Sequence, residues 1–255
     1  MIATFAVAEI QPQRFWQRFW LRFWPWGHMS VQTKVVKNTG FLEVKLNIPT
    51  HCNEKKREKR VKKALKTLYR RGVHRIAVEK EWEGAAQQAW MMPVSARGLW
   101  PALAAKLVLC RMKTENRLGT QTAVRICAKR ADRNVMKCAR LLAKKVRTLQ
   151  VEIPIGGQTV KEMLYEEFGI APAAEIPQNC GKLDLVFEGA CGSGPDALNL
   201  AELEENGENG FILHTPKWAR KQKPKEISDT LYAAMLWQAG ILSADDVIVS
   251  DKKIP

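Results

Sequence analysis

The sequence predicts an α/β fold with a mostly parallel sheet built from two βαβ units. Segments with the period of a strand alternate with segments with the period of a helix along most of the chain. Residues 122–154 contain a strand, a loop, a helix and a second strand, in that order. With 255 residues, 46% apolar and 26% charged, the chain has ordinary globular composition and is long enough to bury a core.

The first βαβ unit begins at residues 41–48, where apolar and polar side chains alternate as in a half-buried strand. Asn53 is the expected N-cap of a helix over 54–71, and Gly72 is the residue type expected just after its end. This helix has one apolar stripe, formed by Val61, Ala64, Leu65, Leu68 and Tyr69. The pattern then predicts a strand over 74–78, a helix over 83–90, a strand over 91–94 and a helix over 98–115.

The second unit begins with a predicted strand over 122–128. Asn134 is the expected N-cap of the helix that follows, because Val135, Cys138, Leu141, Leu142 and Val146 then form its apolar face. The remaining predicted elements are a strand over 148–153, a helix over 159–168 closed by Gly169, a strand over 183–187, a helix over 226–239 and an edge strand over 246–249.

Three parts are expected along the chain. Residues 14–25 hold three copies of a four-residue unit that begins Arg-Phe-Trp, and Met29 follows shortly afterwards. This repetition favours a disordered leader or mis-assigned start over residues 1–30, although a basic aromatic helix is also typical of an interfacial membrane anchor. We expect a basic N-terminal α/β unit over 31–118 and a second α/β unit with a C-terminal helix over 119–255.

The charge is distributed unevenly. Residues 1–150 hold 32 Lys+Arg against 9 Asp+Glu, a net charge of +23, whereas residues 151–255 hold 9 against 17, a net charge of −8. This asymmetry indicates an anionic partner for the basic half, or attraction between the two halves, as in a homo-oligomer. The six cysteines form no Cys-x-x-Cys pair, which favours a reducing, cytoplasmic setting, and no segment has the length and hydropathy of a transmembrane helix.

The first candidate site is the loop over residues 129–134. Lys129, Arg130, Arg133 and Asn134 stand where a dinucleotide-binding loop carries glycines, so basic side chains replace the backbone as phosphate ligands, unless they are solvated residues at the end of a strand. The layout of 122–187 resembles NAD(P)-binding Rossmann domains. From residue 41 onward the chain looks like an uncharacterised bacterial family of degenerate Rossmann-like proteins without the Gly-x-Gly-x-x-Gly fingerprint. The resemblance implies a Rossmann-like fold without a known activity, and it places Glu152 where that family contacts ribose hydroxyls.

Two further candidates carry weaker patterns. Gly156 and Gly157 open the next predicted helix and either expose backbone N–H groups to an anion or form a plain turn. Residues 54–75 hold eleven basic residues against two acidic ones, a pattern of nucleic-acid binding or of a solvated helix face.

No catalytic or metal-ligating constellation emerges from the sequence, because the four histidines are scattered and His51-Cys52 has no second pair at the spacing of a zinc site. The leading hypothesis is therefore a non-catalytic, Rossmann-like interaction or ligand-sensing module. The alternatives are a protein or enzyme that binds NAD(P) or another nucleotide through the basic loop, and a nucleic-acid-associated protein. Any ligand is expected at the carboxyl ends of the strands, among residues 129–134, 155–158 and 189–194.

Overall fold

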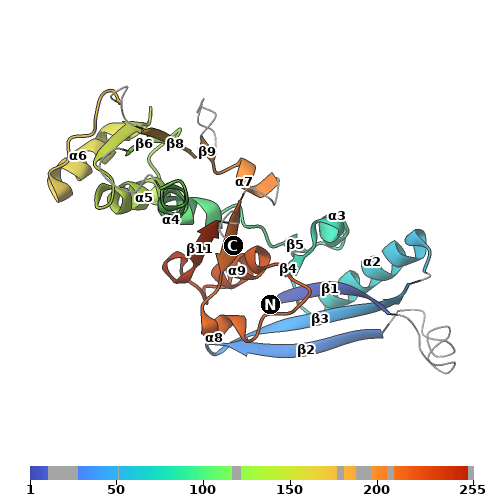
Figure 1. The fold of residues 1–255 in the computed structure, drawn as a ribbon. Helices are drawn as coiled ribbons and strands as arrows, with labels where there is room; N and C mark the ends of the chain where they lie inside the picture. Colours follow the sequence, from blue (N-terminus) through green and yellow to red (C-terminus); the bar gives the residue numbers. More distant parts are fainter. Residues whose placement is uncertain are drawn as a thin grey trace. The chain divides into compact units, whose positions relative to one another are not determined.

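The computed structural model describes residues 1–10, 28–50, 52–116, 122–176, 181–187, 197–205 and 210–251 (Figure 1). They divide into two compact units. Unit 1 comprises Met1–Ser95 and Thr215–Val247, and unit 2 comprises Ala96–His214 and Ile248–Pro255. The chain therefore crosses between the units three times, in contrast to the single boundary expected between residues 118 and 119.

Unit 1 contains a five-stranded sheet among the described residues, in the order β2-β3-β1-β4-β5. The central strand β1 (Ile2–Ile10) pairs in parallel with β3 (Thr39–Pro49) and with β4 (Arg75–Val78). Strand β5 (Met92–Pro93) is parallel to β4, and β2 (His28–Val36) is antiparallel to β3. The sheet is thus mostly parallel, as the sequence predicts.

The position of β1 differs from the expectation that residues 1–30 lie outside the fold. Ala3 and Phe5 are fully buried in the core of unit 1, and His28–Val36 is also a strand. The segment reads IATFAVAEI, a nearly continuous apolar run of the kind found in strands buried on both faces. Its partners β3 and β4 follow later in the chain, so local periodicity does not reveal the pairing. The Arg-Phe-Trp repeats lie at 14–25, outside the described residues.

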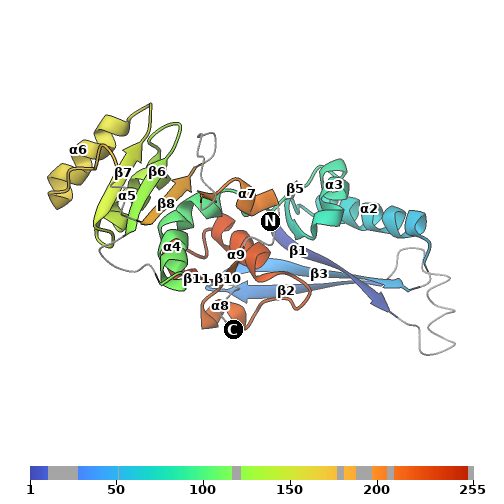
Figure 2. The same cartoon turned by 45° about the horizontal axis from the view of Figure 1, so that its top comes forward.

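Helices α2 (Glu54–Arg70) and α3 (Lys80–Gln88) pack on the same face of this sheet, as both views show (Figures 1 and 2). The side chain of Asn53 accepts a hydrogen bond from the Lys55 N–H at 3.1 Å, which confirms the predicted N-cap. Gly72 has a φ of +83°, a left-handed conformation that glycine adopts without steric cost. The core between helices and sheet is formed by Phe5, Val44, Leu46, Val61, Leu65, Leu68, Ile76 and Ala86.

The return segment of unit 1 contains α8 (Lys217–Arg220), α9 (Asp229–Gln238) and the 3-10 helix η1 (Ala244–Asp246). The fully buried ring of Tyr232 in α9 meets Phe41 edge-on, with ring centroids 6.2 Å apart. Its hydroxyl donates a hydrogen bond to the Ala219 carbonyl oxygen at 3.0 Å. Helix α9 therefore packs within unit 1 and not in the C-terminal part expected from the sequence.

Unit 2 contains a parallel four-stranded sheet among the described residues, in the order β7-β6-β8-β9. Its strands are β6 (Thr122–Cys127), β7 (Thr148–Glu152), β8 (Gly181–Val186) and β9 (Leu198–Asn199). The first strand lies between the second and the third, so the strand order reverses between β6 and β8. Doubly wound α/β sheets bind ligands at such a reversal, beyond the carboxyl ends of the strands.

Helix α5 (Arg133–Ala143) packs against both α4 (Leu99–Thr114) and α6 (Gly157–Phe168). Helix α4 also contacts β8 and belongs to unit 2. The sequence predicted it to belong to the N-terminal part. The described residues of unit 2 further include α7 (Glu202–Glu205) and an antiparallel pair, β10 (Phe211–His214) with β11 (Ile248–Asp251). Together the two units confirm an α/β fold with mostly parallel sheets.

The N-cap of α5 is Asp132 and not Asn134 as expected. The Asp132 carboxylate accepts a hydrogen bond from the Val135 N–H at 2.8 Å. Both residue types are good N-caps. Tertiary pairing determines which of the two residues caps the helix. The Ala131 N–H donates to the Ile155 carbonyl oxygen at 2.8 Å, and this bond fixes the point at which the loop ends and the helix begins. Across the described residues, no helix is long and apolar enough to cross a membrane.

Candidate functional site

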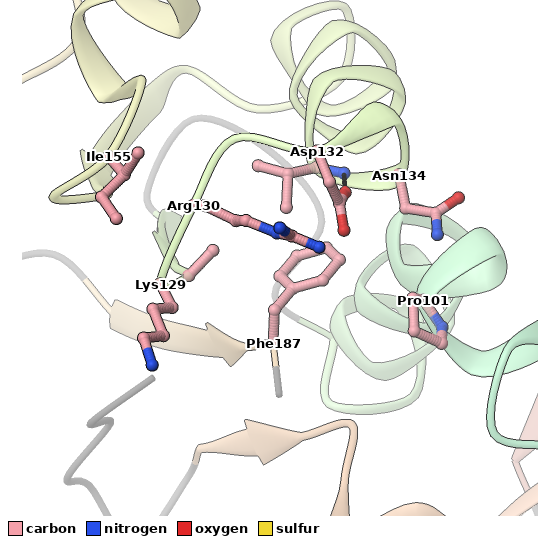
Figure 3. A pocket seen from close by; sticks show the side chains of 9 residues that line it. Pro101, Lys129, Arg130, Asp132, Asn134, Ile155 and Phe187 are labelled. Atoms are coloured by element: carbon pink, nitrogen blue, oxygen red, sulfur yellow. Dashed lines mark hydrogen bonds between the residues drawn. The ribbon is translucent and has the colours of Figure 1, made fainter. Parts of the chain in front are cut away.

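A pocket of about 440 Å³ opens in unit 2 at the carboxyl ends of β6 and β8, where the strand order reverses (Figure 3). Its walls come from the loop after β6, the start of α5, the segments that follow β7 and β8, and the first turn of α4. The lining residues are Pro101, Ala128, Lys129, Arg130, Asp132, Asn134, Val135, Ile155 and Phe187. The pocket therefore lies where an open α/β sheet places a ligand.

The wall of the pocket is an extension of the sheet. Past the end of β6, the Ala128 N–H donates to the Glu152 carbonyl oxygen at 3.2 Å, and Arg130 forms a parallel bridge with Ile155. On the other side, the Phe187 N–H donates to the Cys127 carbonyl oxygen at 2.9 Å. These bonds hold the loop after β6 against the segments that follow β7 and β8.

Lys129 and Arg130 supply the positive charge of the pocket. Both side chains are exposed, and neither has an acidic partner among the described residues. In Figure 3 the Arg130 side chain extends across the pocket in front of the Phe187 ring, whereas the Lys129 side chain leaves the loop in a different direction, at the edge of the lining. Arg133 was expected to join them, but it does not line the pocket.

The N-terminus of α5 is already occupied by a carboxylate. Asp132 accepts the Val135 N–H, so the negative charge that a helix N-terminus favours is supplied by the chain itself. In a glycine-rich dinucleotide loop, the backbone N–H groups at this place hold the pyrophosphate. An anion in this pocket would instead be held by side chains, as the composition of the loop predicts.

Glu152 belongs to a charge cluster on the sheet and does not line the pocket. Its carboxylate accepts a hydrogen bond from Arg125 Nη1 at 3.0 Å. Arg125 also donates to both carboxylate oxygens of Asp184, its register partner on β8, with Nε at 3.0 Å from Oδ1. This hydrogen bonding to Asp184 raises the pKa of Arg125 above its ordinary value.

The pairing of Arg125 with Asp184 was not among the features predicted from the sequence. The side chain of Asp184 is only 5% exposed and that of Arg125 is 17% exposed. A signal was present, because TAVRIC and LDLV each carry one charge, of opposite sign, inside an otherwise buried strand. A buried charge needs a partner, which predicts that two such strands are neighbours.

Gly156 and Gly157 shape the pocket wall and are not among the residues that line it. Gly156 has a φ of +78°, and a Cβ atom on it would lie 3.1 Å from the Ala131 Cβ. A Cβ on Gly157 would lie 3.2 Å from the Ile153 Cβ. Gly156 thus permits the loops after β6 and β7 to approach closely, whereas Gly157 permits a tight turn within the segment that follows β7. Residues 189–194, also expected near the site, lie outside the described residues.

Cys127 directly precedes the pocket-lining Ala128 along the chain. Cys127, at the end of β6, is buried, and burial raises the pKa of its thiol to about 11. A nucleophilic cysteine requires a lowered pKa, so this thiol is not activated. Within the described part of the chain, no group of three or more His, Cys, Asp or Glu side chains is placed to hold a metal ion.

Comparison with known proteins identifies no family for this chain. No protein-family model matches the chain, and no curated protein matches its sequence. Among solved structures, the chain is similar to L-tryptophan dehydrogenase from Nostoc punctiforme, with 12% sequence identity and a TM-score of 0.35. The similarity covers 96% of this chain and 76% of that one. At this TM-score the likeness carries no argument about function.

Proposed function

We propose that this protein is a non-catalytic, ligand-sensing module whose unit 2 binds a nucleotide, NAD(P) included, or another phosphate-bearing anion. One observation carries the proposal. Two cationic side chains without acidic partners among the described residues, Lys129 and Arg130, border a pocket of about 440 Å³ at the reversal of strand order. That volume lies in the range of small-molecule sites.

The lining divides the pocket into parts of different chemistry. Lys129 and Arg130 offer charge to a phosphate, and the guanidinium matches two phosphate oxygens at once. Phe187, Ile155 and Pro101 offer apolar surface to a flat or aliphatic group. The Asp132 carboxylate repels a phosphate, so the phosphate would lie on the side of Arg130, and uncharged hydroxyl or amino groups would lie toward α5.

The side chains beside the pocket support binding without turnover. The Asp132 carboxylate is engaged in capping α5, and Asp184 is neutralised by Arg125. The Cys127 thiol has a pKa of about 11 and stays protonated at neutral pH. None of these groups has the freedom or the pKa that a general base or a nucleophile needs.

Thermal unfolding of the full chain tests the proposal. The panel comprises NAD(H), NADP(H), adenine and guanine nucleotides, S-adenosylmethionine and inorganic phosphate. A ligand at about 100 times its dissociation constant stabilises the folded state by about 2.7 kcal/mol. Arg130→Gln should abolish the shift. Arg133→Gln is the matched control, because it removes the same charge three residues further along the chain without touching the pocket lining.

Glu152→Gln separates two modes of nucleotide binding. In a Rossmann domain an acidic residue at this strand end contacts the ribose, and its loss weakens cofactor binding. Here Glu152 is bonded to Arg125 and does not line the pocket, so we expect the ligand-induced shift to persist in the variant. If no compound shifts the unfolding temperature, or if Arg130→Gln retains the full shift, the pocket is not an anion site.

A further inference from the structure

Helix α2 presents a strongly basic outer face. Seven exposed cations on α2 and just beyond it have no acidic partner among the described residues: Lys55, Lys56, Lys59, Lys66, Arg70, Arg71 and Arg75. Together they are called the α2 basic surface. Two other cations of the helix are paired, Lys62 with Glu58 at 2.6 Å and Arg57 with Glu81 at 3.5 Å. The available acidic groups therefore leave most of the positive charge uncompensated.

The clustering of like charges on α2 destabilises the folded state. Lys55 and Lys59 are four residues apart on the helix, as are Lys66 and Arg70. Like charges at this spacing destabilise a helix, and salt screens the repulsion only in part. Solubility needs far fewer charges, so the α2 basic surface is better explained by a polyanion that neutralises it.

Exposed aromatic rings lie near the C-terminal end of α2, next to the α2 basic surface. Tyr69 stands edge-on to His74, with ring centroids 5.3 Å apart and an interplanar angle of 83°. The His74 carbonyl oxygen accepts the Met92 N–H at 2.8 Å, which brings the turn containing Trp90 beside the start of β4. Tyr69, His74 and Trp90 are called the aromatic edge. Arg70, Arg71 and Arg75 lie among these residues in the sequence.

Trp90 is the most unusual member of the aromatic edge. It is 79% exposed, and its backbone has a φ of +64°. Left-handed conformation is uncommon for a bulky residue, and large aromatic side chains are normally buried for most of their area. Strain and exposure at one position both oppose stability, which is typical of residues retained for binding.

We propose that the α2 basic surface and the aromatic edge together bind single-stranded nucleic acid. Proteins that bind single strands combine cations along the backbone with aromatic rings on which bases stack. A duplex would satisfy the cations but would hide its bases from Tyr69 and Trp90. A membrane surface is less suited, because an interfacial helix needs a large apolar face toward the lipid and the apolar face of α2 is buried in unit 1.

The test is fluorescence anisotropy of the full chain with a short, unstructured, labelled single-stranded RNA. If four cations contact phosphates, the slope of log affinity against log salt is about −3, so affinity falls about fiftyfold between about 50 mM and 200 mM salt. The combined variant Arg70→Gln, Arg71→Gln and Arg75→Gln should reduce the steepness of that slope by about 2. Lys144→Gln, Lys145→Gln and Arg147→Gln, three exposed cations of unit 2, form the matched control and should leave the slope unchanged.

The aromatic contribution is tested separately. Tyr69→Ala should weaken binding about fivefold or more at constant salt slope, which is the effect of losing one stacked base. Trp90→Asn should do the same while keeping the fold, because Asn tolerates the left-handed backbone at this position. Tyr165→Ala, which removes an exposed tyrosine of unit 2, is the control.

The proposal would be overturned by no binding of RNA at low salt, by equal losses in the control variants, or by binding of anionic phosphatidylserine vesicles in place of RNA. Unchanged affinity in both aromatic variants would also overturn it, because the cations alone would not select a single strand. Unit 1 carries this surface and unit 2 carries the pocket, so either proposal can fail while the other holds.

Discussion

Replacing Arg125 by methionine would leave the Asp184 carboxylate, only 5% exposed, without its guanidinium partner. Breaking a buried ion pair from one side costs about 3–5 kcal/mol. Two features place the expected cost at the lower end. Arg125 is itself 17% exposed, and Lys182 Nζ remains 3.7 Å from Asp184 Oδ1. We therefore expect Arg125→Met to lower the free energy of unfolding by about 3 kcal/mol.

A double-mutant cycle makes the prediction sharper. Asp184→Leu leaves Arg125 with Glu152, whose carboxylate is bonded to it at 3.0 Å, so this change should cost less, about 1–2 kcal/mol. The double variant replaces the pair by apolar side chains of similar volume, which is often close to neutral. The two single effects should therefore fail to add, with a coupling of about 2 kcal/mol or more.

The assay is urea unfolding followed by circular dichroism and tryptophan fluorescence. Hydrogen exchange of peptides from β6 and β8 assigns the affected transition to unit 2. Glu152→Gln is the control, because that side chain is 55% exposed and an exposed pair contributes only about 0–1 kcal/mol. If Arg125→Met costs less than about 1 kcal/mol, or if the single effects add, the pair does not stabilise the sheet as a unit.

Three further predictions concern single positions. Gly156→Ala should destabilise unit 2 by about 1–2 kcal/mol in urea unfolding, because the backbone is left-handed and the added Cβ lies 3.1 Å from the Ala131 Cβ; an unchanged midpoint would contradict this. Cys127, with a pKa of about 11, should react with a thiol reagent at neutral pH only after unfolding, and rapid labelling of Cys127 itself in the native chain, located by peptide mapping, would show an activated thiol. Burial raises the pKa of Tyr232 to about 12 from an ordinary 10.0, so the folded state favours the neutral phenol. Its contribution to stability should be complete below pH 10.0 and lost as pH rises toward about 12, which ultraviolet titration with parallel unfolding would detect; a normal tyrosine titration in the folded state would refute it.

Local pattern identified most elements of the fold. One stretch of sequence predicts the Asn53 cap, the apolar stripe through Leu65 and the glycine at position 72. All three features are present in α2 and at its ends. The strands and helix of 122–154 are likewise present, as β6, α5 and β7. Such features are readable because capping, helical periodicity and turn conformation depend on residues a few positions apart.

Pairing between segments that are far apart in the sequence determined the remaining features of the fold. The buried position of β1 depends on β3 and β4, and the membership of α4 and α9 in their units depends on contacts with segments far away in the chain.

The candidate site likewise has features that the sequence predicts and features that depend on the tertiary structure. The sequence by itself determined that the loop after β6 carries Lys129 and Arg130 in place of glycines. Only the tertiary structure decided that Asp132 caps α5 and that Glu152 is hydrogen-bonded to Arg125, beside the Arg125–Asp184 pair, and does not line the pocket. The physical reason is that residue type fixes which hydrogen bonds and ion pairs a side chain can form, whereas the partner it meets is chosen by strand order and register.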